Sequence, residues 1–501
     1  MSDFALSPAA RDVLSRLDSA GLRHRFLHYF AQLASIPRGS GNTRAVSSYC
    51  VQFAREHGLR CVQDPLDNVV IYQGGTPGYE DHPPVILQGH LDMVCVQTPE
   101  SRLDLEREPL LLNTDGAFLW ADGTSLGADD GIAVAYALAV LEAEGLPHPP
   151  LEVVFTTEEE TGMSGAHGLD PALLRGRVLL NLDSENEGLF FAGCSGGSKR
   201  TVALPVVREA QDGLLAELEV GGLLGGHSGI MIADGRANAC QVLFDLLAQL
   251  AVPCGLRLVS CSGGGKDNAI PSSARARVLL PPEHLEQARR IVRVFRSELH
   301  SSAMLQRYGK NNPDLAVTFT PAEEVRGCSA LDHPSTVRFI SLFHHLPCGL
   351  LAMMRDIPGV PETSANIGVV ELEESRAVIR LSVRSALKEK CASLPRQVEE
   401  TAARFGASCQ VSGAYPPWEY RKDSPLRETV CRVYRQAAGR EAEIRVIHAG
   451  LECGILYEKL PGLDAVSFGP TILDIHSPGE RLDLASALRT WEFLTALLAA
   501  L

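Results

Sequence analysis

The sequence predicts an α/β fold, in which a domain built on a mostly parallel sheet carries an inserted α+β domain. The length of 501 residues exceeds what one hydrophobic core usually holds, so at least two domains are expected. Short apolar runs alternate with helical stretches in the first part of the chain, which indicates a parallel sheet. A glycine-rich stretch, Gly193–Gly197, then separates this pattern from longer strand-like segments and two strong helical segments.

The elements of the first part follow in order. Apolar residues from Arg11 to Ile36 recur at helical spacing and the pattern stops at Pro37, which predicts one or two opening helices. Apolar runs then predict strands at 68–72, 85–88, 152–155 and 177–181, with a helix over 132–141.

The later elements predict the inserted domain and the return of the chain. Helical spacing predicts helices at 238–250 and 284–299, and two strand-like segments within 364–387 flank a turn as a hairpin. A helix at 394–405, a strand at 464–468 and a helix over 484–498 look like further parts of the first domain. We therefore expect residues 1–197 and 393–501 to form one domain and residues 198–392 to form the inserted one.

Charge and composition exclude several classes of protein. A net charge of −15 and a pI of about 5.5 leave no broad basic surface for nucleic acid or anionic lipid. The opening residues lack the apolar core of a secretory signal, and no later apolar run is long enough to span a membrane, so we expect a cytoplasmic protein without a membrane partner. Thirteen cysteines without a C-x-x-C pair argue against a disulfide framework and a structural zinc ribbon.

Carboxylates and histidines stand at the ends of predicted strands, where α/β proteins place their ligands. His90 and Asp92 lie two residues apart on an extended backbone and point the same way, so the carboxylate can hold one imidazole nitrogen while the other binds a metal. Glu158, Glu159 and Glu160 follow another strand. Three adjacent acids are costly unless cations neutralise them or solvent screens them, and an acidic run by itself is more often a solvated turn.

Further acids and a histidine extend this set. Asp129 and Asp130 precede a predicted helix, where a carboxylate could bridge two cations, although an isolated aspartate there is more often an N-cap. Asp183 and Glu185 directly follow an apolar strand, and His476 lies late in the chain. Nitrogen and oxygen ligands without cysteine suit zinc, with manganese or cobalt as substitutes.

Longer motifs extend over nearly the whole chain. They are GHLDMV (89–94), TSLGADDGIAVA (124–135), TEEETGMSGAHGL (157–169), NLDSENEG (181–188), GGHSG (225–229), NAIP (268–271), ETSANIG (362–368), VIHAGLECG (446–454) and GPTILDIHSP (469–478). Together and in this order they resemble the Xaa-His dipeptidases, also called aminoacyl-histidine or beta-alanyl-histidine dipeptidases, relatives of the carnosinases, carboxypeptidase G and aminoacylase. VIHAGLECG and GGHSG favour this family over the wider clan.

The resemblance implies a di-zinc catalytic domain with an inserted α+β lid domain, a dipeptide substrate and a homodimer. It also implies five ligands for two zinc ions. Asp129 would bridge both ions, His90 and Asp183 would complete one site, and Glu160 and His476 would complete the other.

Glu159, the first acid of the E-E-x-G pair, matches the general base of the family. Two metals lower the pKa of a bridging water and polarise the scissile carbonyl. Glu159 would take the proton of this water and return it to the leaving amine, a contribution of ~10²–10⁴-fold. Asp92 would orient His90, and Glu158 has no assigned role.

The resemblance also implies contacts from the lid. His227 matches a histidine that could stabilise the oxyanion, although alone it could equally be a turn residue. Arg384 would bind the terminal carboxylate of the substrate, because arginine binds carboxylates through two hydrogen bonds, although exposed strand arginines are common. Four further residues lie in matching motifs as substrate contacts, with the last of them facing the substrate amine: Asn268, Asn366, His448 and Glu452.

Other interpretations remain open at this point. An aminoacylase on the same scaffold would differ in its lid residues. An inactive metal-binding homologue would have no use for Glu159, and a calcium-binding protein is disfavoured by the histidine ligands and by the lack of an EF-hand loop. One departure is Asp130, which stands where the family often has asparagine, and it could alter the choice of metal.

Overall fold

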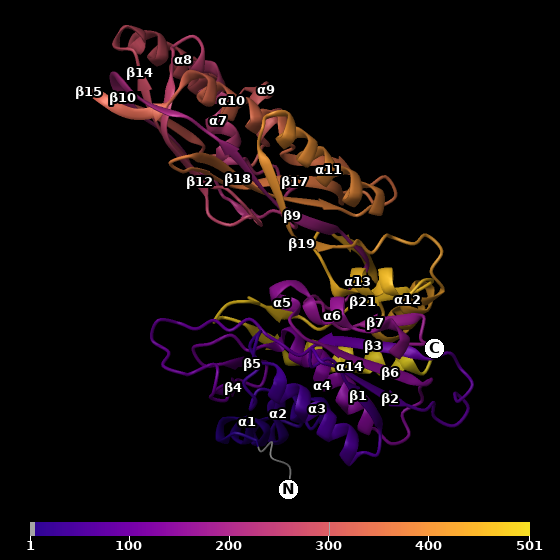
Figure 1. Ribbon diagram of the computed structural model, residues 1–501. Helices are drawn as coiled ribbons and strands as arrows, with labels where there is room; N and C mark the ends of the chain where they lie inside the picture. Colours follow the sequence, from indigo (N-terminus) through magenta and orange to yellow (C-terminus); the bar gives the residue numbers. More distant parts are fainter. Residues whose placement is uncertain (1–5, 300) are drawn as a thin grey trace. The chain divides into compact units, whose positions relative to one another are not determined.

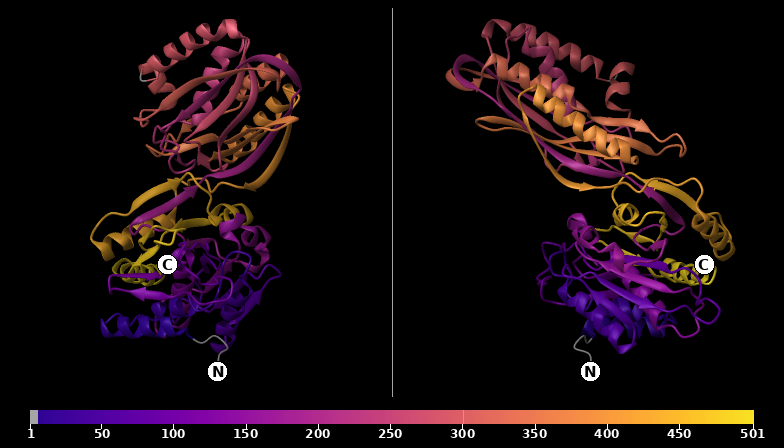
Figure 2. Two further views of the ribbon diagram at one scale, coloured as in Figure 1. Left: turned by 90° about the vertical axis from the view of Figure 1, so that its left-hand side faces the viewer. Right: turned by 45° about the vertical axis from the view of Figure 1, so that its right-hand side comes forward.

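The computed structural model describes residues 6–299 and 301–501, and the chain divides into two compact units. The first unit comprises the chain up to Gly193 together with Tyr420–Arg445 and Leu451–Leu501. The second unit comprises Cys194–Glu419 and Val446–Gly450. Figures 1 and 2 show each unit as a sheet with helices packed against it.

An eight-stranded sheet forms the middle of the first unit, in the order β1-β2-β6-β3-β7-β21-β8-β20. The four central strands β6, β3, β7 and β21 are parallel, whereas β1, β2 and β8 pair antiparallel with their neighbours. The predicted parallel sheet is therefore found at the centre of a mixed sheet. The strands are β1 (Arg60–Gln63), β2 (Val69–Gln73), β3 (Val85–His90), β6 (Leu151–Thr156), β7 (Val178–Asn181), β8 (Leu189–Cys194), β20 (Glu443–Ile447) and β21 (Asp464–Ser467).

Helices enclose this sheet. β3 and β6 are buried along their whole length, which is typical of parallel strands that are covered on both faces. The helix whose first turn carries the acidic pair, α4, is buried on all sides and packs against α2 and β3. The helices are α1 (Pro8–Ser19), α2 (Arg25–Leu33), α3 (Arg44–Glu56), α4 (Ala128–Glu142), α5 (Glu159–Gly162), α6 (Ser164–Gly168), the 3₁₀ turn η1 (Pro171–Leu173), α12 (Pro425–Ala438), α13 (Glu452–Lys459) and α14 (Leu484–Leu498).

A small four-stranded sheet completes the first unit, in the order β22-β23-β5-β4. It joins β4 (Leu112–Thr114) and β5 (Phe118–Ala121) to β22 (Ile472–Leu473) and β23 (Arg481–Asp483), so it pairs an early segment with a late one. His476 lies in the turn between β22 and β23.

The second unit is an α+β unit with a nine-stranded sheet, whose main order is β15-β10-β14-β12-β17-β18-β9-β19, with β16 paired to β17. The pairings described within it are antiparallel. The strands are β9 (Gly196–Pro205), β10 (Arg208–Gly221), β12 (Arg257–Gly264), β14 (Ala274–Leu280), β15 (Ala316–Leu331), β16 (Gly349–Met353), β17 (Pro361–Leu372), β18 (Arg376–Ser385) and β19 (Ser408–Tyr415).

Helices of the second unit gather on one face of its sheet (Figure 2). They are α7 (Ala239–Ala251), the 3₁₀ turn η2 (Pro282–His284), α8 (Leu285–Glu298), α9 (Ser302–Tyr308), α10 (His333–His345) and α11 (Lys388–Arg404). A separate two-stranded ribbon, formed by β11 (Gly226–His227) and β13 (Ala269–Ile270), lies next to β17. The predicted helices at 238–250 and 284–299 and the predicted hairpin correspond to α7, α8 and β17–β18.

One boundary differs from the expected one. The helix expected at 394–405 in the first domain is part of α11, which packs on β9, β18 and β19 of the second unit. The reason is its apolar face, since Leu394, Val398 and Ala402 are buried in the core of that unit. The second unit therefore continues to Glu419, whereas the sequence placed the return near residue 393.

Among residues 6–299 and 301–501, no helix has the length and the apolar character that crossing a membrane requires.

Candidate active site

Three neighbouring parallel strands deliver candidate residues to one edge of the first unit's sheet. His90 is the last residue of β3, Glu159 follows the end of β6, and Asp183 follows the end of β7. β6 and β7 pair with β3 on its two sides, so the carboxyl ends of all three strands meet. This edge is where open α/β sheets bind their ligands.

Asp129, at the start of α4, lies between two histidines. Its Oδ1 is 3.2 Å from His90 Nε2, and its Oδ2 is 3.1 Å from His476 Nε2. Each carboxylate oxygen thus faces a different imidazole. A carboxylate in this arrangement is placed to hold two cations at once.

A further carboxylate stands beside each histidine. Asp183 Oδ1 is 3.8 Å from His90 Nε2, and Glu160 Oε1 is 2.9 Å from His476 Nε2. The ligand atoms of Asp129, Glu160 and His476 lie within 4.8 Å of one another. The structure therefore brings together all five residues that the sequence proposed as metal ligands.

The charges of this group influence one another strongly. Although burial opposes it, hydrogen bonding with His476 and His90 holds the pKa of Asp129 below its usual value. In turn, Asp129 and then Glu160 raise the pKa of His476 to about 11. Carboxylates that stabilise a positive charge at this position are suited to stabilise a bound cation there.

Asp130 is a further buried carboxylate at the site. Its Oδ2 accepts the main-chain N–H of His90 at 3.1 Å, and its ligand atoms lie within 4.8 Å of those of His90 and Asp183. Burial, and then the charge of Asp183, raise the pKa of Asp130 well above its usual value. The side chain also fills the space beside Gly89, where a Cβ atom would lie 2.5 Å from Asp130 Oδ2.

Asp92 differs in detail from the sequence prediction. His90 Nδ1 lies 3.0 Å from the main-chain oxygen of Asp92, whereas the nearest carboxylate oxygen is 3.5 Å away. The carboxylate instead accepts the main-chain N–H groups of Glu159 and Glu160, at 3.1 and 3.3 Å, and the hydroxyl of Ser40 at 2.8 Å. Asp92 therefore orients His90 through its backbone and the start of α5 through its side chain.

Glu159 stands beside the proposed ligands. Its carboxylate forms a compact group with His90 and Glu160. Burial, and the nearby charge of Asp183, raise the pKa of Glu159 well above its usual value. A buried carboxyl group with a raised pKa, next to proposed metal ligands, is a candidate for proton transfer.

Two buried charged residues that the sequence analysis missed hold the segment that carries Asp129. Glu480 is 2% exposed, and its carboxylate accepts the main-chain N–H groups of residues 126–129 at 2.8, 3.0, 2.8 and 3.3 Å. Arg38 is also 2% exposed and donates to the main-chain oxygens of Leu91 and Gly127. The sequence signal for Glu480 was its place in the same segment as His476.

The structure disagrees with the role expected for Glu452, because this residue has no exposed surface. Its Oε2 accepts hydrogen bonds from Gln88 Nε2, at 2.6 Å, and from the hydroxyl of Thr156. Burial raises the pKa of Glu452 to about 7. The carboxylate therefore lies inside the first unit, between the ends of β3 and β6, and the expected contact with a substrate amine does not fit.

A second group of candidate residues lies in the second unit. The β11–β13 ribbon pairs His227 with Ala269, next to the exposed Asn268. His227 Nδ1 accepts the main-chain N–H of Ile230 at 3.2 Å, so the neutral ring carries its proton on Nε2. Burial, and then Arg384, lower the pKa of His227 to about 4, which keeps the ring neutral at pH 7.

Arg384 and His448 belong to the same group. Arg384, on β18, donates from Nη1 to the hydroxyl of Tyr415 at 2.7 Å. His448 is 4% exposed, and its Nε2 shares a hydrogen bond of 2.7 Å with Ser364 Oγ. Burial, and then the charge of Arg384, lower the pKa of His448 to about 3. These contacts hold a guanidinium beside two neutral imidazoles.

The structure also disagrees with the substrate contact expected for Asn366. It is 2% exposed, and its amide donates to the main-chain oxygens of Asp267 and Ala269 at 3.2 and 2.8 Å. Its own oxygen accepts from Asn238. The side chain therefore holds the turn that carries Asn268, and the expected contact with substrate does not fit.

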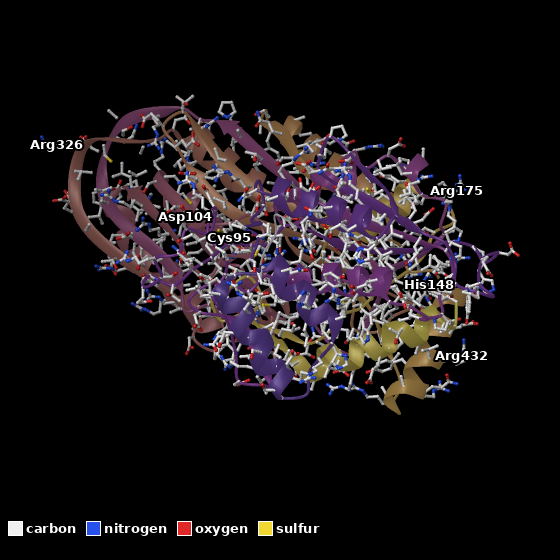
Figure 3. The ribbon with its side chains drawn as sticks, turned by 90° about the horizontal axis from the view of Figure 1, so that it is seen from below. Cys95, Asp104, His148, Arg175, Arg326 and Arg432 are labelled. Carbon is white, nitrogen blue, oxygen red and sulfur yellow. The ribbon has the colours of Figure 1, made fainter. Side chains whose placement is uncertain are left out.

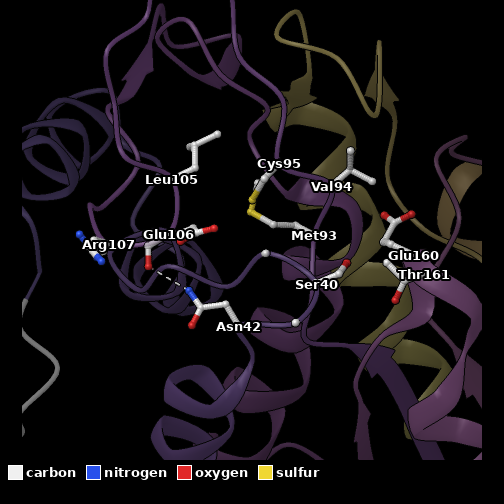
Figure 4. A pocket seen from close by; sticks show the side chains of 12 residues that line it. Ser40, Asn42, Met93, Val94, Cys95, Leu105, Glu106, Arg107, Glu160 and Thr161 are labelled. Atoms are coloured by element: carbon white, nitrogen blue, oxygen red, sulfur yellow. Dashed lines mark hydrogen bonds between the residues drawn. The ribbon is translucent and has the colours of Figure 1, made fainter.

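A cavity of about 670 Å³ opens beside Glu160 (Figure 4). We call it the Leu105 pocket. Figure 3, seen from below, labels two of the residues in or next to its wall, Cys95 and Asp104. The pocket is lined by Gly39–Asn42, Met93–Cys95, Leu105–Arg107, Glu160 and Thr161, all of the first unit.

Two family models match parts of the sequence. Residues 86–240 and 299–500 match Peptidase family M20/M25/M40. The chain belongs to this family. Residues 218–303 match the peptidase dimerisation domain. Membership confirms the predicted fold, a metallopeptidase catalytic domain with an inserted domain, and the predicted class of enzyme, a hydrolase of peptide bonds.

Individual M20 relatives are similar over the full length. The cytosol non-specific dipeptidase of Escherichia coli K12 is 35% identical over 471 residues, which cover 94% of this chain and 96% of the relative. The crystal structure of aminoacylhistidine dipeptidase from Vibrio alginolyticus is 34% identical, with a TM-score of 0.87 and coverage of 100% of this chain and 98% of that one. These relatives confirm the resemblance to Xaa-His dipeptidases.

The fold also extends to more distant members of the M20 family. A metallo-carboxypeptidase of the family from Sulfolobus solfataricus has a TM-score of 0.55 at 13% identity, over 95% of this chain and 98% of that one. At this identity the likeness concerns the fold alone.

Proposed function

We propose that the protein is a metal-dependent dipeptidase that hydrolyses Xaa-His and other dipeptides with two zinc ions, for which manganese or cobalt can substitute. The observation that carries the proposal is Asp129, whose two oxygens face two histidines that each have a further carboxylate beside them. The full-length similarity to two dipeptidases supports the choice of substrate.

The donor set fits zinc. Imidazole nitrogens and carboxylate oxygens, with no thiolate among them, are ligands of catalytic zinc sites. His90 and Asp183 would hold one ion, Glu160 and His476 the other, and Asp129 both. Bound there, the metal pair supplies a water of lowered pKa and a polarised scissile carbonyl.

Glu159 is the general base of the proposed reaction. It receives a proton as water attacks and delivers it to the nitrogen of the leaving amine. Asp92 keeps this residue in place, because its carboxylate accepts the Glu159 N–H at 3.1 Å. A base that is fixed in this way can act without reorganisation.

Residues of the second unit bind the substrate in this proposal. His227 donates its Nε2–H to the oxyanion, because its Nδ1 is occupied and its ring is neutral. Arg384 binds the terminal carboxylate, and Asn268 and His448 contribute further polar contacts. The first unit is then the catalytic domain and the second the lid.

Assembly and location form a further part of the proposal. The match of residues 218–303 to a peptidase dimerisation domain supports a homodimer. The name of the relative from Escherichia coli supports a cytoplasmic location.

A substrate panel tests the proposal. The zinc-loaded protein is given Gly-His, Leu-His, Leu-Leu, a tripeptide and N-acetyl amino acids, with a parallel sample that has been dialysed against a chelator. We expect cleavage of the dipeptides, its loss after chelation and its return with two zinc ions per chain. Cleavage of N-acetyl amino acids alone would identify an aminoacylase, and no cleavage with two ions bound would contradict the proposal.

A further inference from the structure

The Leu105 pocket takes no part in the chemistry described so far. Its volume of about 670 Å³ lies within the range of about 300–1,000 Å³ that is common for small-molecule sites. Glu160, a proposed metal ligand, forms part of its wall. The pocket therefore borders the proposed metal site at this ligand.

Hydrogen bonds connect the pocket wall to the catalytic segments. Ser40 Oγ donates to Asp92 Oδ2 at 2.8 Å, and the Gly41 N–H donates to Glu158 Oε1 at 2.8 Å. Across the pocket, Asn42 Nδ2 donates to the main-chain oxygen of Glu106 at 2.9 Å (Figure 4). The wall is therefore formed in advance of any ligand.

The loop that carries Leu105 is also held by local bonds. Asp104 Oδ1 accepts the N–H of Glu106, and its main-chain oxygen accepts the N–H groups of Arg107 and Glu108 at 3.0 and 2.7 Å. These bonds close a tight turn around residues 104–108. Leu105 therefore has a defined position, half-buried against the core of the first unit.

The lining favours an uncharged side chain. Met93, Val94, Cys95 and Leu105 offer aliphatic and sulfur atoms, and Gly39 keeps this surface open, because a Cβ there would lie 2.7 Å from Cys95 Sγ. Glu160 is a proposed metal ligand, and the other two charged residues of the lining, Glu106 and Arg107, are exposed and opposite in charge, so together these two favour neither sign of ligand. Thioether and thiol groups adapt to apolar groups of varied shape.

We propose that the Leu105 pocket binds the side chain of the N-terminal residue of the dipeptide and prefers aliphatic and thioether side chains. This inference rests on the proposed function. The scissile carbonyl belongs to the N-terminal residue and is bonded directly to its Cα, so the side chain of that residue starts closer to the carbonyl than the side chain of the C-terminal residue does. The C-terminal residue instead carries the carboxylate that Arg384 binds.

A substitution that fills the pocket tests this assignment. In Leu105→Trp, the larger ring occupies the space of the substrate side chain. We expect kcat/KM for Leu-His and Met-His to fall at least tenfold, while kcat/KM for Gly-His stays within twofold of the wild type. Leu111→Trp is the matched control, because Leu111 is 47% exposed and lies outside the pocket lining. It should change none of the three values.

Other outcomes would overturn the assignment. An equal loss for Gly-His, Leu-His and Met-His in Leu105→Trp would mean that the loop supports the metal site instead. A loss that follows the second residue, in a comparison of Gly-Leu with Gly-Gly, would place the C-terminal side chain in the pocket.

A binding measurement keeps this test separate from the proposed function. Reduced-amide analogues of Leu-His and Gly-His cannot be cleaved, and their affinity for the zinc-loaded protein is measured by calorimetry. Weaker binding of the Leu-His analogue alone in Leu105→Trp supports the pocket even if wild-type turnover of dipeptides is absent. Unchanged binding of both analogues would refute the pocket even if the dipeptidase activity is found.

Discussion

Asp129 and Glu159 both lie beside His90 and have different parts in the proposed reaction. The Asp129 carboxylate faces His90 and His476, so it contributes to both proposed metal positions. Glu159 is held through its backbone by Asp92, which leaves its carboxylate available for proton transfer. Substitutions at these two residues should therefore have different effects.

Glu159→Gln should retain two zinc ions per chain and lose ~10²–10⁴-fold in kcat, because an amide cannot accept the proton. Asp129→Ala should lose both zinc and turnover, because it removes the shared ligand. Zinc content by atomic absorption and kcat for Gly-His distinguish the two. Glu158→Gln is the matched control and should behave as the wild type, and near-normal turnover in Glu159→Gln would disprove the mechanism.

His448 links the second unit's stability to pH. In the folded state, burial and then the charges of Arg384 and His227 lower the pKa of His448 to about 3. A hydrogen bond with the main-chain oxygen of Pro361 opposes this shift. In the unfolded chain the ring gains its proton near pH 6.5. Below that pH the unfolded state binds the proton first, so stability is lost as pH falls from about 6.5 toward 3.

The expected slope is up to about 1.4 kcal/mol of unfolding free energy per pH unit. His448→Asn removes this titration, so the difference in stability between wild type and variant should narrow as pH falls from 6.5 to 5. Urea unfolding of both proteins at several pH values measures this difference in unfolding free energy. A difference that stays constant over this range would contradict the assignment.

Residue identities were easier to predict than residue environments. The motifs identified the five proposed ligands, because their spacing along strand ends reflects the metal chemistry. The same motifs suggested that Glu452 and Asn366 contact substrate, yet both are buried among the chain's own polar groups. A motif gives the position of a side chain in the chain, whereas its burial depends on which distant elements pack around it.

At the scale of elements, the segment that delivers His476 also delivers Glu480. The Glu480 carboxylate accepts four successive N–H groups at the entrance of α4, next to Asp129. Anions are stabilised at such a position by the unpaired N–H groups and the helix dipole. One late segment thus supplies a proposed ligand, His476, and also holds the backbone of the bridging residue, Asp129.

Glu480→Gln should weaken zinc binding by about 10–100-fold, because the amide keeps one acceptor oxygen where the carboxylate has two. Titration of the apo-protein with a zinc buffer measures the dissociation constant directly, without turnover. Glu187→Gln is a suitable control, because the Glu187 side chain is only 10% exposed and pairs with Arg489, outside the proposed ligand set. Zinc affinity equal to the wild type would mean that Glu480 supports folding alone.

At the scale of the whole molecule, the fold class was predictable and the boundaries were less so. Parallel strands and their helices are close in sequence, so their alternation is visible in a single pass along the chain. The long antiparallel strands of the second unit depend on partners far along the chain, such as β9 between β18 and β19. For the same reason α11 was assigned to the wrong unit, because its apolar face does not reveal which sheet it covers.

The order of the strands in the first unit has a consequence for biosynthesis. β21 lies between β7 and β8, yet it is made long after both of them. A nascent chain that ends before Asp464 contains β7 and β8 but lacks β21, the strand that lies between them. The ribosome must therefore complete nearly the whole polypeptide before the first unit can close its sheet, whereas most of the second unit is already available by Glu419.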